Sequence, residues 1–196
     1  MHRPLEGIRV LDLSRILAGP YAAQSLGDLG ANVTKIEAPW GDDTRGWGPP
    51  FQNGFNGEPV ASYFLSCNRG KDIHRGNIKE DRERIQSLMA NSDVVIENFR
   101  PGTFERYLGP IPKGIILCSI SGYGQDGPRR DEPAFDLTMQ ARSGIMSITG
   151  EAAGPPAKVG VAWIDVMTGM NAVSAILAAL YHRERTGEGA RIDISL

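Results

Sequence analysis

The feature that most constrains the fold is a strand–helix–strand pattern near the N-terminus. The segment IRVLDLS, residues 8–14, is mostly apolar and rich in branched side chains, which is typical of a buried strand. Residues 19–30 follow a helical pattern, with Pro20 suited to the first helical position and Gly30 to the position after the helix. The segment ANVTKIEAP, residues 31–39, predicts a second strand. This βαβ unit implies parallel pairing and a right-handed crossover.

The rest of the chain continues the alternation of strands and helices. We expect helices over Ile78–Asn91, over the first part of residues 133–150 and over Val166–Arg185. The further strands expected are Asp93–Phe99, Gly114–Gly124 and residues 191–196. Ala38–Glu58 is rich in Gly, Pro, Asn and Asp, which predicts a long loop. The pattern indicates an α/β fold, a Rossmann-like, mainly parallel sheet flanked by helices.

Composition narrows the classes of function. The 196 residues carry a formal net charge of −2 and have neither the basic tail nor the acidic run that indicates nucleic acid or a membrane surface. Partners are expected to be small molecules or other protein chains. The apolar window Val166–Tyr181 contains Thr168, Gly169, Asn171 and Ser174. We expect a buried core helix there, since a membrane span needs ~20 predominantly apolar residues.

The cysteines and histidines predict neither a disulfide framework nor a metal centre. Cys67 and Cys118 lie far apart and form no CxxC pair, which is typical of a reducing compartment. We expect a cytoplasmic protein, with a mitochondrial location as the alternative. His2, His74 and His182 are scattered along the chain, so no metal site and no Ser–His pair is predicted.

Common nucleotide-binding and catalytic motifs are missing from the sequence, which has no GxxxxGK[ST], HExxH or GxSxG. Glu37 ends the second strand about twenty residues after the first turn, where a ribose-binding acid belongs in a dinucleotide site. That turn reads SRILAGP, however, and lacks the GxGxxG glycines that let a backbone approach a pyrophosphate. A nicotinamide site is therefore the weaker alternative.

One carboxylate stands at the start of the most apolar helix. In VAWIDVMTGM, residues 161–170, Asp165 lies among apolar neighbours. One interpretation is an N-cap, for which Asp is a preferred residue. The other is a reactive carboxylate, because a helix N-terminus favours the ionised form and an apolar environment strips its hydration. On the residues alone the N-cap is the favoured role, because Asp caps are common.

Segments along nearly the whole chain carry a resemblance to one family. They read PLEGIRVLDLSRILAGPYAAQSLGDLGANVTKIEAP, GDDTRGWGPPF, SCNRGK, NSDVVIENFRPG, ILCSISGYGQDGP, AFDLTMQARSGIMSITG, GVAWIDVMTGM and ERTGEGARIDISL. In this order they resemble the class III CoA-transferases (the formyl-CoA, carnitine and succinyl-CoA–glutarate group), which are related to the α-methylacyl-CoA racemases. The resemblance implies that residues 1–196 are the N-terminal CoA-binding and catalytic part of an incomplete large domain, without the family's second domain. It also implies a homodimer for the full-length protein.

The resemblance further implies a CoA-transferase activity and a role for Asp165. Its carboxylate attacks an acyl-CoA, forms a mixed anhydride and then an aspartyl-CoA thioester, from which a carboxylic acid acceptor takes the CoA. Succinyl-CoA is the expected donor. The CoA thioester is a substrate, and no permanently bound cofactor is expected. The alternatives are an inactive CoA-binding fragment and a racemase-like enzyme. The racemase branch has a histidine where this chain has Phe135, so transfer is preferred.

The family's CoA contacts fall at several places in this chain. They are Leu17 and Ala18, Gly76 and Lys79, Asn98, Phe99 and Arg100, and Arg106. Ligands of open parallel sheets bind beyond the carboxyl ends of strands, which supports Asn98, Phe99 and Arg100. Lys79 and Arg106 have a plainer interpretation as solvated surface charges.

Overall fold

The fold is built on one parallel sheet. The computed structural model describes residues 2–54 and 57–196, and within them a six-stranded sheet has the order β5-β2-β1-β6-β7-β8. The strands are β1 (Arg9–Asp12), β2 (Asn32–Glu37), β5 (Asp72–Arg75), β6 (Val94–Glu97), β7 (Ile116–Ser121) and β8 (Ala190–Ser195). All neighbours in this sheet pair in parallel. The predicted α/β fold with a mainly parallel sheet is confirmed.

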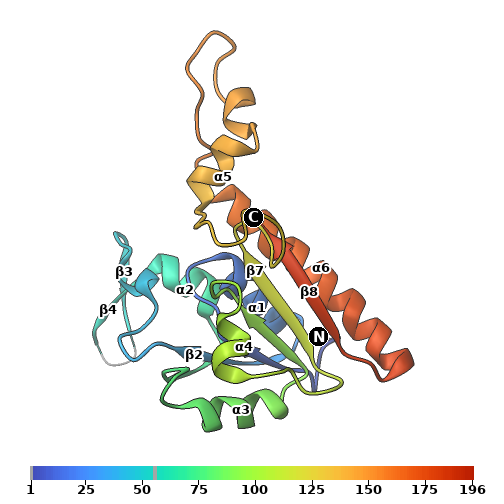
Figure 1. Cartoon of the computed structure of the whole chain (residues 1–196). Helices are drawn as coiled ribbons and strands as arrows, with labels where there is room; N and C mark the ends of the chain where they lie inside the picture. Colours follow the sequence, from blue (N-terminus) through green and yellow to red (C-terminus); the bar gives the residue numbers. More distant parts are fainter. Residues whose placement is uncertain (1, 55–56) are drawn as a thin grey trace.

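Helices cover both faces of the sheet (Figure 1). They are α1 (Ala18–Asp28) and α6 (Trp163–Thr186) on one face, and α3 (Arg82–Ala90) and α4 (Thr103–Leu108) on the other. Val10 belongs to the core beneath α1 and α6, whereas its neighbour Leu11 belongs to the core beneath α3 and α4. Successive strand residues point to opposite faces, so the continuous apolar runs of the strands supply both cores.

The loop expected over Ala38–Glu58 is wrong in part. It contains the 3-10 helix η1 (Asp43–Gly46) and strand β3 (Phe51–Asn53), which pairs antiparallel with β4 (Pro59–Ala61). Residues 55 and 56 of the predicted loop lie outside the described residues. The helix α2 (Ser62–Asn68), which the sequence did not predict, follows β4. Strands of three residues are too short to show the alternation by which a strand is recognised.

The helix expected from Ile78 begins later, at Arg82. The Asn77 amide donates to the Asp81 carboxylate at 2.7 Å, and the Lys79 amide donates to the Asn77 side chain at 3.0 Å. Asn and Asp side chains compete with helix formation through local bonds of this kind, which explains the later start.

Helix α6, predicted as a buried core helix, contributes to the core but is buried on one side only. It runs for 24 residues, and it buries Ala172 and Ile176 while Met170 and Tyr181 are 50% and 67% exposed. Its length and apolar composition would suffice to cross a membrane, a property that core helices of soluble proteins share. The expectation that this segment is too short to span a membrane is therefore wrong, because the helix extends beyond the window Val166–Tyr181. Ahead of it, α5 (Asp136–Arg142) and the 3-10 helix η2 (Ile145–Ile148) project from the sheet (Figure 1).

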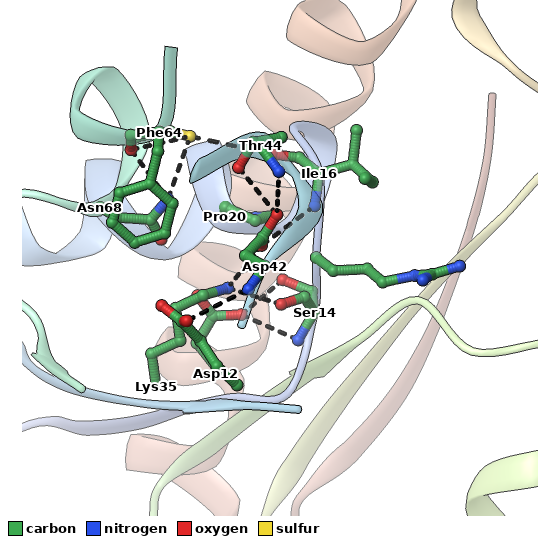
Figure 2. A network of polar contacts seen from close by, with 12 residues as sticks. Asp12, Ser14, Ile16, Pro20, Lys35, Asp42, Thr44, Phe64 and Asn68 are labelled. Atoms are coloured by element: carbon green, nitrogen blue, oxygen red, sulfur yellow. Dashed lines mark hydrogen bonds and ion pairs between the residues drawn. The ribbon is translucent and has the colours of Figure 1, made fainter. Parts of the chain in front are cut away.

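A cluster of buried charges joins β1 and β2 (Figure 2). The Lys35 Nζ atom lies 3.6 Å from Asp12 Oδ2 and 3.4 Å from Asp42 Oδ2, and Lys71 Nζ lies 2.8 Å from Asp12 Oδ2. Burial acts to raise the pKa of Asp12, but the two lysines outweigh it and lower that pKa to about 2. Two positive and two negative groups balance one another, which is the condition under which buried charges are tolerated.

Replacing Asp12 by Ala is expected to destabilise the chain by about 3 to 5 kcal/mol, since both lysines then lose a buried counter-charge. Chemical unfolding at neutral pH measures the change. The matched control is Asp131→Ala, since the Asp131 side chain is 83% exposed and its pair with Arg130 contributes little. A loss in Asp12→Ala no larger than in the control would contradict the assigned role of the cluster.

Candidate active site

Asp165 lies in the first turn of α6 but does not cap it. The helix begins at Trp163, its N-cap residue is Ala162, and this residue makes no side-chain cap bond. Asp165 is therefore the third residue of the helix, and its side chain is partly buried. Of the two interpretations of Asp165, the N-cap is wrong.

The cap is supplied by Asp136, the first residue of α5. Its Oδ1 atom accepts hydrogen bonds from the amides of Ile164 at 2.8 Å and Asp165 at 3.2 Å. Its Oδ2 atom accepts one from Gln140 Nε2 at 2.6 Å. A carboxylate from a neighbouring helix thus satisfies amides that α6 cannot satisfy itself.

The Asp165 carboxyl group has an altered acidity. Burial, and secondarily the charge of Asp136, raise the pKa of Asp165 to about 6. Tyr63 on α2 is close enough to respond, since burial and then the Asp165 charge raise its pKa to about 12. Near neutral pH, Asp165 is thus mostly ionised, more basic than an ordinary aspartate and poorly hydrated.

Asp165 lines a cavity of about 180 Å³ that the N-terminus of α1 also reaches. Leu17, Ala18 and Asn98 line this cavity with it, so the structure brings these predicted site residues together. The first amides of a helix have no intrahelical acceptor and form its positive end. An anionic group that developed in this cavity would therefore be stabilised by the start of α1.

The turn before α1 is held in an unusual conformation. Ile16 has a φ of 71°, a left-handed conformation that is costly for a branched residue. Its amide donates to Asp42 Oδ2 at 3.3 Å. The Asn98 side chain both accepts from the Arg15 amide at 3.0 Å and donates to the Arg15 carbonyl at 2.8 Å. Asn98 and Asp42 therefore fix the direction in which α1 starts.

A second cavity, of about 450 Å³, adjoins the first one, since Arg15 and Asn98 line both. Its lining includes the predicted residues Gly76, Lys79, Asn98, Phe99 and Arg100, and also Trp40. Cavities of this size are typical of small-molecule sites. A larger cavity of about 730 Å³, lined by Arg3, Gln24 and Arg69 among others, contains none of the predicted site residues.

Arg106 is the one predicted residue that lines neither of the two adjoining cavities. Its guanidinium lies 5.3 Å from the centre of the Tyr107 ring, and Lys79 Nζ lies 5.4 Å from the same ring. Tyr107 thus contacts both cations, and Lys79 lines the cavity of about 450 Å³. Two such cations suit the phosphate groups of a ligand.

Glu37 is not available to bind a ribose. Its Oε2 atom accepts from Arg45 Nε at 2.8 Å and from the Asp42 amide at 3.1 Å, and its Oε1 atom accepts from Arg45 at 2.7 Å. Arg75 lies 3.0 Å from the same carboxylate. These contacts occupy the acid on which the dinucleotide alternative depended.

Sequence reasoning missed the residues that position the site, chiefly Asp136, Gln140, Asp42 and Lys35. The one local signal was the spacing of Asp136 and Gln140, which are four residues apart on α5 and bond to each other. The contacts from Asp136 to α6 span 28 and 29 residues of sequence, and no local pattern predicts them.

The family model for CoA-transferase family III matches residues 5–196. The chain is 47% identical over 203 residues to the succinate–glutarate CoA-transferase of Agrobacterium fabrum, covering 98% of this chain and 51% of that protein. It is 48% identical over 203 residues to the succinyl-CoA:glutarate CoA-transferase of Mus musculus, covering 99% and 45%.

A solved structure gives the same result. The crystal structure of a CAIB/BAIF family protein from Brucella suis matches with a TM-score of 0.95 and 46% identity, covering all of this chain and 53% of that one. The chain thus spans about half the length of the relatives it matches.

Replacing Asp165 by Ala is expected to stabilise the chain at high pH. The folded-state pKa of about 6 exceeds the ordinary 3.8, so ionisation penalises the folded state as pH rises through this window. At about pH 8 the variant should gain about 1 to 3 kcal/mol in unfolding free energy, and the gain should shrink toward about pH 4. Chemical unfolding at both pH values measures it. A loss of about 1 kcal/mol at both would instead indicate a helix cap.

Proposed function

The chain belongs to CoA-transferase family III, and from this premise we propose that it moves CoA from an acyl-CoA donor to a carboxylic acid through Asp165. One observation carries the proposal. The Asp165 carboxylate is poorly hydrated, does not cap its helix, and lines a cavity that adjoins the cavity of about 450 Å³ through Asn98. Succinyl-CoA is the proposed donor, since the relatives with the names quoted above use succinate or succinyl-CoA.

In each step of the proposed reaction, one bond to a carbonyl carbon forms and another breaks. The Asp165 carboxylate attacks the thioester carbonyl, the carbon–sulfur bond breaks, and a mixed anhydride and CoA thiolate form. The thiolate then attacks the aspartyl carbonyl, releases the donor acid and leaves an aspartyl-CoA thioester. The acceptor carboxylate displaces the thiolate from Asp165, and the thiolate attacks the acceptor carbonyl of the new anhydride. The product acyl-CoA leaves, and the Asp165 carboxylate is restored.

The geometry supports each half of this reaction. Removal of water raises the energy of the Asp165 carboxylate, and its higher basicity favours attack. The start of α1, at Ala18, faces the same cavity and stabilises the oxyanion that forms at the attacked carbonyl. Lys79, Arg100 and Arg106 would hold the phosphates of CoA, with the rest of the nucleotide in the cavity of about 450 Å³.

A racemase needs a base beside the aspartate to move an α-proton. Phe135 lines the Asp165 cavity at the position where the racemase branch has its histidine, and a phenyl ring cannot take a proton. CoA transfer is therefore the better-supported function.

We also propose a homodimer, in which a partner would cover the exposed apolar side chains of α6, such as Met170 and Tyr181.

Replacing Asp165 by Asn is expected to abolish CoA exchange and to leave CoA affinity within a few-fold, because the substitution leaves the cavity of about 450 Å³ intact. The chain is incubated with succinyl-CoA and hydroxylamine, and the hydroxamate on Asp165 is located by mass spectrometry. Calorimetry measures CoA binding. Well-folded chain that binds CoA without forming the adduct would point to the inactive fragment, and loss of binding in the variant would mean a structural role.

Replacing Lys79 or Arg106 by Ala is expected to weaken CoA binding about tenfold, ~1.4 kcal/mol, because each supplies a cation to a phosphate. The effect should shrink for a CoA analogue without the 3′-phosphate and at high salt. Lys113, an exposed lysine outside both cavities, provides the control variant Lys113→Ala. Equal affinities for all three variants would support the plainer interpretation as solvated charges.

A further inference from the structure

We propose that Asp136 is a positioning residue for Asp165: it caps α6 in place of Asp165 and holds a negative charge beside the Asp165 carboxylate. The inference rests on the proposed function of Asp165 as the nucleophile. It assigns to α5 a part in the reaction that neither the fold nor the sequence pattern assigns to it.

Asp136 caps α6 and thereby leaves the Asp165 carboxylate free of that role. An acidic residue at the third helical position commonly turns back to bond the amides of its own helix start, as in a capping box. Such a bond would tie up the oxygen that has to attack the substrate. Here Asp136 already accepts from the amides of Ile164 and Asp165, and the Trp163 amide donates to the Val161 carbonyl at 2.8 Å. These three amides therefore make no demand on the Asp165 carboxylate, and among the described residues no hydrogen bond ties that carboxylate to the start of α6.

Asp136 is itself held in place by Gln140. Gln140, which is 1% exposed, donates through Nε2 to Asp136 Oδ2 at 2.6 Å and to the Val161 carbonyl at 3.2 Å. Its Oε1 atom accepts from the Val159 amide at 2.8 Å. Gln140 thus fastens α5 to the segment that leads into α6. The carboxylate of Asp136 is fixed on both oxygens and cannot turn away from Asp165.

Asp136 also acts on Asp165 through its charge. Asp136 and Asp165 line the same cavity, and the charge of Asp136 adds to the effect of burial on the Asp165 carboxyl group. Two further groups near the two carboxylates do not cancel this charge. Tyr63 responds to both carboxylates and stays neutral, and the Arg15 guanidinium lies 3.4 Å from Asp43. A more basic carboxylate is a stronger nucleophile, so the pair favours attack on a thioester.

The test replaces Asp136 by Asn, which keeps an oxygen that can accept an amide bond but removes the charge. Carbon-13 NMR of labelled aspartate follows the titration of Asp165 in the wild type and the variant. Its midpoint is expected to fall by about 0.5 to 1 pH unit, because the like charge is only part of the cause. Hydroxamate formation at about pH 8 should slow about threefold to tenfold, with CoA affinity unchanged. Asp131→Asn, which changes an exposed carboxylate, should alter neither quantity.

Each outcome decides the inference separately from the proposed function. Folded Asp136→Asn with the wild-type titration of Asp165 would overturn the inference. Wild-type chain that gives no hydroxamate would refute the proposed nucleophile, whereas the titration would still measure the effect of Asp136. If Asp136→Asn does not fold, Gln140→Met takes its place, since it removes the donor that fixes Asp136, together with the bonds of Gln140 to Val159 and Val161. Slower trapping with unchanged CoA affinity supports the inference, and unchanged trapping contradicts it.

Discussion

The buried pairing of Lys35 and Lys71 with Asp12 and Asp42 is the interaction on which the rest of the structure depends. Moving such charges out of water costs several kcal/mol each unless they neutralise one another. Their balance fixes the end of β1 against β2 and holds the loop that follows. Asp42 also accepts the amide of Ile16, so the same cluster sets the strained turn from which α1 begins. A structural charge cluster thereby directs a helix N-terminus into the candidate active site.

The site is assembled where parallel strands end. Parallel strands bring the loops after β1, β2, β6 and β7 to one edge of the sheet, which is where ligands of such sheets bind. Asn98, directly after β6, lines both cavities and bonds to the amide and the carbonyl of Arg15. In the smaller of these two cavities, α5 and α6 bring Asp136 and Asp165 together. The proposed nucleophile and the proposed CoA cavity are thus placed by separate elements, and Asn98 lines the cavities of both.

The sequence predicted the sheet well and the site only in part. The βαβ unit and the later strands were recognisable because buried parallel strands are continuous apolar runs. The edge strand β5, with the polar sequence DIHR, and the short β3 and β4 gave no such signal. The resemblance placed Leu17, Ala18 and Asn98 at the site, but the capping of α6 by Asp136 depends on a contact between distant segments. The exposure of one side of α6 was missed because composition reports apolarity and not the direction of a side chain.

The most direct test of Asp165 as the nucleophile follows an oxygen atom of the acceptor carboxylate. If the acceptor acid attacks an aspartyl-CoA thioester, one oxygen of its carboxylate remains on Asp165 when the product leaves. The chain is supplied with succinyl-CoA and an acceptor whose carboxylate carries heavy oxygen, and the peptide that contains Asp165 is weighed by mass spectrometry. We expect the label to enter this side chain as exchange proceeds. Turnover that leaves Asp165 unlabelled would contradict it.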